Sequence, residues 1–337
     1  MAQVSVVGGG ALGSMICARL ALGGLRAKLV VRPGSAKALL ARDLGGRVEV
    51  RLSGASAEAA KIDVDVCVRA EDAALVVLCT KVFDARDALR LALPNDAAAG
   101  KKVLVLCNGS LSLLGHPGAA LVAGTTTHGC WERGPFDVVH AGVGRIWSAD
   151  DDFVKVLDCA GLGAAKVQDS EMADRLWRKL AANAVLNPLT GLHGVVNGSA
   201  LACADREASA RRVVAEVAAV HNASRLRGAR LPNAAHDAAH DAAPDAVLTA
   251  RNDLCADELY GAPPFARPLR SLVVGSVVEC ALENATNYSS MYQDVKNHRR
   301  TEIDALNGWV NDVGAKLGVE TPENRRLADL VRARHPR

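Results

Sequence analysis

Three polar residues at a spacing of four stand in an otherwise apolar part of the chain. Lys179, Asn183 and Asn187 lie in an Ala- and Leu-rich segment, Leu176–Pro188. Four residues advance about 400° around a helix of about 3.6 residues per turn, so the three side chains follow one drifting stripe. Such a stripe either faces water or converges on a polar group. An ammonium in a convergent site can stabilise and protonate an oxygen on which negative charge develops.

A second group of polar residues lies near the C-terminus. Asn287 and Ser290 open the segment Asn287–Asp294, and Glu302 follows Thr301. A carboxylate at Glu302 can orient an ammonium or accept a hydroxyl. A simpler interpretation of Glu302 is an acidic residue in the first turn of a helix, where the macrodipole favours it. Lys179, which follows Arg178, could likewise belong to a solvated helix face.

The N-terminus carries a glycine-rich turn between an apolar run and a helical pattern. The turn has the pattern GxGxxG and comprises Gly8, Gly9, Gly10, Ala11, Leu12 and Gly13. Gly8 permits the tight turn, Gly10 lets the backbone approach a pyrophosphate, and Gly13 lets helix and strand pack closely. The free N–H groups at the start of the helix favour phosphate. This loop predicts a dinucleotide site.

Residues at the ends of later strands indicate which dinucleotide is bound. NAD sites place an acidic residue after the second strand, but here Arg32 stands there. Its guanidinium suits a 2′-phosphate, so we predict NADP(H), although a solvated strand-end charge is the alternative. Lys81 and Asn108 follow two further strands. They are expected at the same sheet edge, Lys81 near the cofactor and Asn108 near nicotinamide or substrate. Taken alone, Lys81 is more often an ordinary surface lysine, and Asn108 is equally well explained as a turn residue.

The elements that position these residues differ between the two halves. Four short apolar runs predict buried parallel strands, namely Gln3–Val7, Ala27–Val31, Leu75–Cys79 and Val103–Cys107. With a helix over Ala11–Leu22, they predict an α/β, Rossmann-like, doubly wound domain whose last strands lie at about Val138–Trp147. We place this domain at residues 1–169.

From about Ser170 the pattern becomes helical, so we place a helical substrate and catalytic domain at residues 170–337. Its first helix should kink or end at Asn187–Pro188. Further helices are expected over Ala208–Arg227, Leu272–Thr286 and Thr301–Leu317, the last ended by Gly318. Another should open at Thr321–Pro322, with Thr321 as N-cap.

An insertion at about 231–270 separates these helices and is rich in Ala, Asp, His and Pro. His236 and His240 have a spacing that would suit a metal on a helix, but a solvated Ala-rich segment is the better interpretation, and we predict no metal site.

Composition narrows the class of protein. A net charge of +3 over 337 residues gives no support for a nucleic-acid surface. The nine cysteines are odd in number and show no CxxC, which favours free thiols in a reducing compartment. No apolar run is long enough for a membrane span, and the chain starts directly with a strand pattern. We expect a cytoplasmic protein with no membrane partner.

Taken in order, four blocks resemble the ketopantoate reductases (2-dehydropantoate 2-reductases). They are the Gly8–Gly13 loop, the turn Cys107–Gly109, the Lys179/Asn183/Asn187 helix, and the segment running from Ser289-Ser290-Met291 through Thr301-Glu302-Ile303-Asp304 to Asn307-Gly308. The resemblance covers most of the chain. It implies a Rossmann-like domain joined to a helical domain of the 6-phosphogluconate dehydrogenase type, with the active site in the cleft between them.

The resemblance also implies roles for individual residues. Lys179 is the general acid and Glu302 its partner carboxylate. Asn108, Asn183, Asn187, Asn287 and Ser290 surround the substrate and nicotinamide, while Gly8–Gly13, Arg32 and Lys81 contact the cofactor. The implied reaction is NADPH-dependent reduction of ketopantoate to pantoate in pantothenate and coenzyme A biosynthesis. A reductase of another 2-oxo acid and a non-catalytic NADP(H) sensor are the alternatives, and the sequence leaves monomer or homodimer open.

Overall fold

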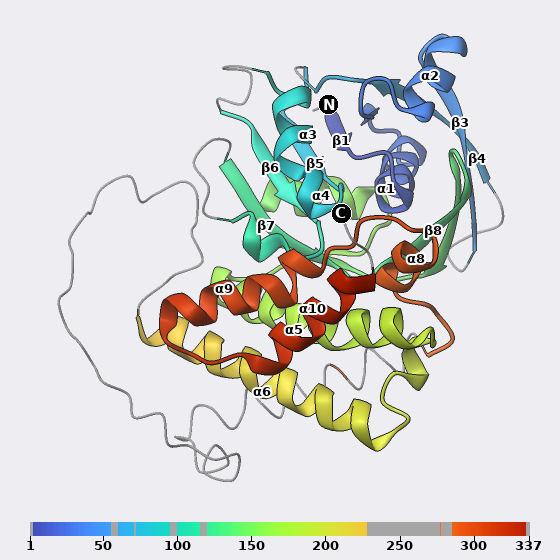
Figure 1. Cartoon of the computed structure of the whole chain (residues 1–337). Coiled ribbons are helices and arrows are strands. Elements are labelled where there is room, and N and C mark those ends of the chain that lie inside the picture. Colours follow the sequence, from blue (N-terminus) through green and yellow to red (C-terminus); the bar gives the residue numbers. More distant parts are fainter. Residues whose placement is uncertain are drawn as a thin grey trace. The chain divides into compact units, whose positions relative to one another are not determined.

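The computed structural model describes residues 3–54, 60–70, 72–94, 100–114, 120–227, 277 and 285–334 (Figure 1). The described residues form two compact units, of which the first ends at Leu176 and the second begins at Trp177. This division falls a few residues after the position expected from the sequence. It lies inside one helix, α5 (Asp169–His193).

The first unit is built on one eleven-stranded sheet with the order β11-β10-β7-β6-β5-β1-β2-β4-β3-β9-β8. Its strands are β1 (Val4–Val7), β2 (Ala27–Val30), β3 (Arg47–Gly54), β4 (Ala60–Cys67), β5 (Leu75–Leu78), β6 (Lys102–Val105), β7 (Ala120–Thr126), β8 (Gly129–Gly134), β9 (Asp137–Gly142), β10 (Ile146–Ser148) and β11 (Ala164–Lys166). The helices of this unit before α5 are α1 (Ala11–Leu22), α2 (Ala36–Asp43), α3 (Ala85–Ala92) and α4 (Asp151–Cys159).

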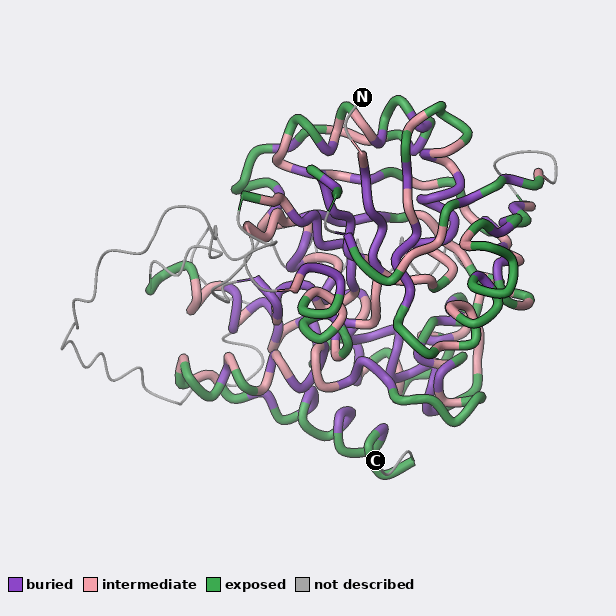
Figure 2. Tube along the Cα trace, turned by 90° about the horizontal axis from the view of Figure 1, so that it is seen from above, coloured by how far each residue is buried: buried purple, intermediate pink, exposed green. Residues whose placement is uncertain are grey.

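The central strands pair in parallel in the order β4-β2-β1-β5-β6-β7, which is the doubly wound arrangement that the sequence predicts. All four predicted strands are present within a residue or two, and α1 has the predicted bounds. Every residue of β1 and β5 is buried, and Figure 2 shows the buried strand that follows the N-terminus. Since β2 and β5 lie on opposite sides of β1, the strand order reverses at β1, where open sheets of this type bind ligands.

Outside its centre the sheet departs from the expected parallel pattern. The pairs β3–β4, β8–β9 and β7–β10 are antiparallel. The expectation that the last strands lie near Val138–Trp147 was wrong, because β11 follows and pairs in parallel with β10. Short strands such as Ala164–Lys166 carry too few residues for an apolar period to show.

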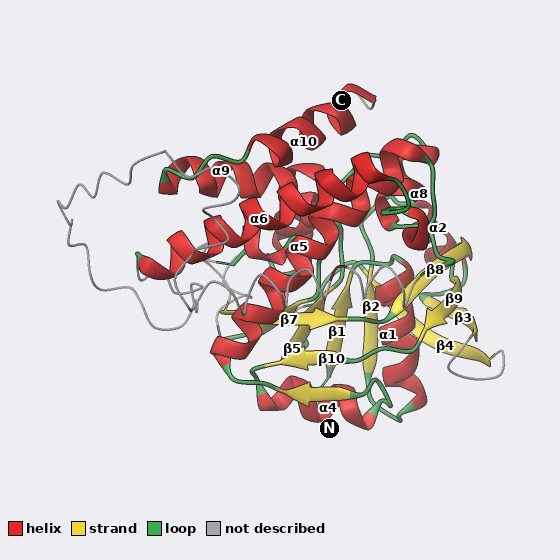
Figure 3. Cartoon of the chain, turned by 90° about the horizontal axis from the view of Figure 1, so that it is seen from below, coloured by secondary structure: helices red, strands yellow, loops and turns green. Residues whose placement is uncertain are grey.

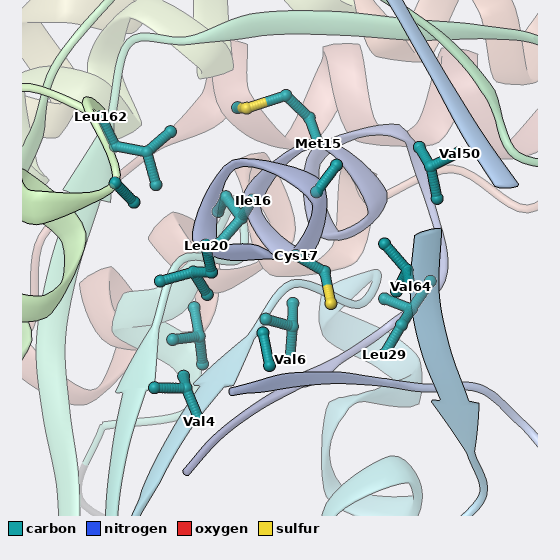
Figure 4. Packing of buried hydrophobic residues seen from close by; sticks show 14 of the residues in the cluster. Val4, Val6, Met15, Ile16, Cys17, Leu20, Leu29, Val50, Val64 and Leu162 are labelled. Atoms are coloured by element: carbon teal, nitrogen blue, oxygen red, sulfur yellow. The ribbon is translucent and has the colours of Figure 1, made fainter. Parts of the chain in front are cut away.

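Small and aliphatic side chains fill the core of the first unit. Met15, Ile16 and Leu20 of α1 are completely buried and belong to one hydrophobic cluster with Val4 and Val6 of β1 (Figure 4). Full burial of an aliphatic side chain of this size contributes about 1.5–3 kcal/mol. With aromatics at 3% of the chain, this packing replaces the large rings that anchor many cores.

The described residues of the second unit contain helices and short 3-10 turns but no strand (Figure 3). Besides the later part of α5, they comprise α6 (Ala204–Leu226), α8 (Ser290–Lys296), α9 (Asn307–Leu317), α10 (Pro322–Arg334) and the 3-10 turns η4 (Asn197–Ser199) and η6 (Ile303–Ala305). Helices α6, α9 and α10 pack against one another.

Helix α5 does not end at Pro188, as the sequence allowed, but continues to His193. Proline has no N–H to bond the carbonyl four residues earlier, which here belongs to Ala184. The Asn307 side-chain amide donates a hydrogen bond to the Ala184 oxygen over 2.9 Å. Asn307 is completely buried, so a side chain from α9 replaces the missing backbone donor.

The helix expected over Thr301–Leu317 is broken. The turn η6 occupies its first part, and Leu306, with φ −104° and ψ −98°, separates it from α9. Gly318 ends α9 in the left-handed conformation, as predicted.

The N-terminus of α10 is capped differently from the prediction. The Thr321 hydroxyl donates to the Asn311 side chain over 2.8 Å instead of accepting from the helix. The Glu216 carboxylate of α6 accepts the N–H groups of Glu323 and Asn324 over 2.8 and 2.9 Å. Burial raises the pKa of Glu216.

Several expectations concern residues outside the described part of the chain. These are the 231–270 insertion with His236 and His240, and nearly all of the helix expected over Leu272–Thr286. The seven cysteines within the described residues are free thiols. Among the helices described, none combines the length and the apolar character that crossing a bilayer demands.

Candidate functional site

In the first unit, backbone hydrogen bonds align the carboxyl ends of the central strands. The Gly8 N–H donates to Val30 O over 3.0 Å, Cys79 N–H to Val7 O over 2.8 Å, and Leu106 N–H to Leu78 O over 3.0 Å. The residues that follow these strands therefore share one edge of the sheet. The residues predicted from the sequence to contact the cofactor lie at this edge, namely the Gly8–Gly13 loop, Arg32, Lys81 and Asn108.

The glycine loop lies so close to its neighbours that two of its positions cannot carry a side chain. Gly8 has φ +115°, and a Cβ there would lie 2.9 Å from the backbone of Cys79 and Thr80. A Cβ on Gly13 would lie 1.9 Å from Gly8 O. Gly8 thus permits the turn and Gly13 the close helix–strand approach, as the sequence predicts.

Gly10 is different, because a Cβ at this position would meet nothing within 4 Å. It is the N-cap of α1, whose first turn presents N–H groups without partners inside the helix. The first turn of α1 contains no acidic residue that would repel an anion. Open space beside a helix N-terminus fits a dinucleotide pyrophosphate.

The other predicted cofactor contacts differ in exposure. Arg32 is exposed two residues after the end of β2, where no acidic residue stands. Lys81 and Asn108 are half-buried at the ends of β5 and β6, and Gly109 beside Asn108 adopts the left-handed conformation at φ 70°. Burial raises the pKa of Cys79 well above its ordinary value, so this nearby thiol stays protonated.

The structure adds Lys37 of α2 to this edge. Its ammonium donates hydrogen bonds to Gly9 O and to the carboxylate of Glu132 on β8. Nothing in the local sequence distinguishes Lys37 from an ordinary surface lysine, because Glu132 is 95 residues away along the chain.

In the second unit the stripe on α5 becomes more buried along its length. Lys179 and Asn183 are half-buried, and Asn187 is only 6% exposed. Thr190, three residues further on, is completely buried, and its hydroxyl lies 2.6 Å from that of Ser289. The stripe is therefore not a solvated helix face, and Thr190 extends it beyond the predicted residues.

This hydroxyl pair brings the Asn287–Ser290 block against α5. Asn287 is half-buried, and its carbonyl accepts the Asn197 N–H over 2.9 Å. Ser290 is exposed as the first residue of α8, whereas Ser289 is buried and caps that helix by accepting the Tyr292 N–H over 3.0 Å. Of the two adjacent serines, the one predicted from the sequence is thus the more accessible.

Aromatic rings pack beside the start of the stripe. The Trp177 ring lies 4.8 Å from the His221 ring and 5.4 Å from the Trp309 ring, measured between centroids. Trp177 precedes Lys179 by two residues, so these contacts to α6 and α9 fix the turn of α5 that carries Lys179. Glu302 belongs to the same unit and is 4% exposed at the start of η6.

Comparisons with known proteins match both halves of the chain to one family. Residues 4–152 match the family model described as ketopantoate reductase PanE/ApbA, and residues 171–335 match its C-terminal model. A 2-dehydropantoate 2-reductase of Halobacterium salinarum is 30% identical, with 98% of each chain covered. One of Archaeoglobus fulgidus is 26% identical, with 98% of this chain and 97% of the other covered.

Solved structures show the same fold. A PanE/ApbA family ketopantoate reductase from Ralstonia eutropha superimposes with a TM-score of 0.74 at 25% identity, covering 99% of this chain and 98% of the other. D-mandelate dehydrogenase in its ternary structure with NADH and anilino(oxo)acetate gives 0.72 at 20% identity, with the same coverage. The glycine loop, the buried stripe on α5 and these matches together place the chain in the ketopantoate reductase family of nicotinamide-dependent oxidoreductases.

Proposed function

We propose that the protein reduces 2-dehydropantoate to (R)-pantoate with NADPH, as a step of pantothenate and coenzyme A biosynthesis. The observation that carries this proposal is the polar stripe on α5, which runs into the interior of the second unit at Asn187 instead of facing water. Relatives that match the chain over nearly its whole length are named 2-dehydropantoate 2-reductases.

Lys179 is the proposed general acid. Reduction of a ketone builds negative charge on its oxygen, and an ammonium aimed at that oxygen stabilises the charge and supplies the proton. A helix holds Lys179 on a rigid element. Glu302 is proposed as the partner carboxylate that orients the ammonium and accepts a substrate hydroxyl, and its burial makes that interaction stronger than it would be in water.

Neutral donors complete the proposed substrate site. In the second unit the amides of Asn183, Asn187 and Asn287 and the hydroxyl of Ser290 can bind the carboxylate and hydroxyl groups of a 2-oxo acid without adding charge. In the first unit the Asn108 amide is the proposed neutral contact to nicotinamide or substrate. Hydrogen bonds from uncharged groups leave Lys179 as the cation closest to the reacting oxygen in this scheme.

The first unit fits a nicotinamide dinucleotide. Gly8–Gly13 would hold the pyrophosphate, with Lys81 and Asn108 at the neighbouring strand ends. When bound, the cofactor supplies the hydride. Arg32 is the proposed contact to the 2′-phosphate, since an exposed guanidinium stands where NAD sites carry an acid. The residue types at this edge therefore favour NADPH over NADH.

A panel of 2-oxo acids, each assayed with NADPH and NADH, tests the proposal. We expect the highest kcat/KM with 2-dehydropantoate and NADPH. If NADPH oxidation is no faster with 2-dehydropantoate than without it, the proposed substrate is wrong.

An aryl-substituted 2-oxo acid such as phenylglyoxylate is the second candidate substrate. The rings of Tyr288 and Tyr292 stack with centroids 4.1 Å apart, and Tyr288 is 45% exposed. Tyr288 lies between the proposed substrate contacts Asn287 and Ser290, and an exposed ring favours contact with another aromatic group. In the panel, a higher kcat/KM for phenylglyoxylate than for 2-dehydropantoate would identify this substrate class.

A further inference from the structure

The Lys37 side chain of α2 contacts three groups of the first unit. It donates hydrogen bonds to the Gly9 carbonyl oxygen and the Glu132 carboxylate, and its ammonium lies 4.9 Å from the centre of the Phe136 ring. Only 15% of the Lys37 side chain and 27% of the Glu132 side chain are exposed. Lysine side chains are seldom so enclosed.

The contact with Gly9 bears on the cofactor loop. In a trans peptide the C=O and the following N–H point in opposite directions. By holding Gly9 O, Lys37 fixes the direction of the Gly10 N–H. Beside Gly10 the protein leaves open space, because a Cβ there would meet nothing within 4 Å. The carbonyl side of this peptide is therefore held by an ammonium, and the space beside Gly10 is open to a ligand.

The ion pair with Glu132 neutralises the charge of Lys37. A lysine paired with a carboxylate adds no net charge to the loop, so Lys37 is not organised as a counter-ion for phosphate. Its geometry suits orientation of the loop backbone. Arg32, which has no carboxylate partner among the described residues, remains the cation suited to a 2′-phosphate.

Phe136 supports the same arrangement. It is 3% exposed and has φ +60°, a conformation uncommon for a bulky residue. Arg51 N–H donates to its carbonyl over 2.8 Å and holds the turn between β8 and β9. Strained backbone persists where its surroundings fix it, often at ligand sites. Here it places a ring against the Lys37 ammonium, in a cation–π contact.

We propose that Lys37 is a positioning residue for the dinucleotide pyrophosphate, acting through the Gly9–Gly10 peptide and held in place by Glu132 and Phe136. The proposal rests on the proposed function only for the class of cofactor, a nicotinamide dinucleotide. It requires neither 2-dehydropantoate nor Lys179. Because NADPH and NADH share the pyrophosphate, Lys37 must affect both equally.

The test is calorimetric titration of the full-length protein with NADPH and with NADH, without substrate. For Lys37→Met we expect the Kd of both cofactors to rise by the same factor, about tenfold, which corresponds to 1.4 kcal/mol. Lys37→Arg keeps a charged donor and should bind both within about threefold of the wild type. The matched control is Lys28→Met, a half-buried lysine paired with Asp72, with no expected change in either Kd.

Kinetics provides a second readout. With saturating cofactor, Lys37→Met should keep the wild-type kcat while its KM for cofactor rises. Should Lys37→Met not fold, Lys37→Gln serves in its place. An unchanged Kd, a loss confined to NADPH, or an equal loss in Lys37→Arg would each overturn the positioning role. If the wild type itself binds neither cofactor, the proposed function fails instead.

Discussion

In the first unit the candidate ligand contacts are mainly backbone groups, whereas in the second they are side chains along one helix. Gly8 and Gly13 act by having no side chain, since each lies against backbone where a Cβ would not fit. Lys179, Asn183 and Asn187 act through the ammonium and amide groups of their side chains. Substitutions should therefore separate the two regions, one mainly by cofactor binding and folding, the other mainly by turnover.

The largest difference is expected from Lys179→Ala. Loss of a general acid typically lowers a rate by about 10²–10⁴-fold, so kcat should fall to that extent. NADPH affinity, measured by titration without substrate, should match the wild type because the cofactor contacts lie in the first unit. Arg178→Ala, at the adjacent residue, is the control. Unchanged turnover in Lys179→Ala would show that the stripe has another role.

Gly13→Ala and Gly10→Ala should separate two roles of the glycine loop, stability of the fold and binding of the cofactor. At Gly13 the added Cβ would meet Gly8 O at 1.9 Å, so we expect a loss of about 3 kcal/mol or more in the free energy of unfolding. At Gly10 the space is open and φ is −78°, so the free energy of unfolding should change by less than about 1 kcal/mol while cofactor affinity falls. Chemical denaturation and titration measure the two effects. Equal stability of both variants would contradict the loop geometry.

Arg32→Ala sharpens the distinction between the shared and the specific parts of the cofactor. Removal of a charged hydrogen-bonding partner costs about 1.5–3 kcal/mol, so the Kd for NADPH should rise by roughly ten- to a hundredfold. The Kd for NADH should change little. Equal weakening of both cofactors would argue against a 2′-phosphate contact.

In the second unit, Asn307→Ala tests how α5 passes Pro188. The substitution removes buried hydrogen bonds to Ala184 O and to the Asn324 side chain over 2.9 and 3.0 Å. We expect a loss of about 1–3 kcal/mol in the free energy of unfolding, with kcat lowered because the Lys179 helix shifts. Asn297→Ala, on an exposed face, is the control. A stable Asn307→Ala protein would mean that Ala184 needs no such donor.

The smallest effect concerns the pH dependence of the first unit. His128 Nδ1 lies 2.9 Å from His140 Nε2, and burial, with a lesser contribution from nearby positive charge, lowers the pKa of both. For His140 the pKa falls from 6.5 to about 4. The unfolded chain therefore binds protons first, and stability should be fully present above pH 6.5 and decline as the pH falls toward 4.

Thermal unfolding across this range measures the effect. His140→Gln should flatten the decline between pH 6.5 and about 4.5. Below that range Glu323 becomes the relevant group. Burial opposes its charge, but hydrogen bonds from Arg326, Ser209 and Arg212 outweigh that and lower its pKa to about 2. If the His140→Gln protein loses stability with falling pH as steeply as the wild type, groups other than His140 cause the pH dependence.

Much of the architecture was predictable from the sequence, because it depends on neighbours in the chain. The bounds of α1 and, to within two residues, those of the four predicted central strands follow from apolar periodicity and glycine placement. The α5 stripe follows from a spacing of four. The continuation of α5 past Pro188 was not predictable, because a residue from another element, Asn307, stabilises it. The break at Leu306 was not predictable either, because neither Gly nor Pro marks that position.

The sequence by itself determined the fold class, the family and the residue types of the candidate site. The tertiary structure decided which distant residues contact these side chains and keep them in place. Lys37 meets Glu132 across 95 residues, Thr190 meets Ser289 across 99, and Glu216 caps α10 across more than 100. Local pattern fixes which face a side chain occupies. Which distant group lies opposite depends on how the sheet and helices pack, and no local period records that.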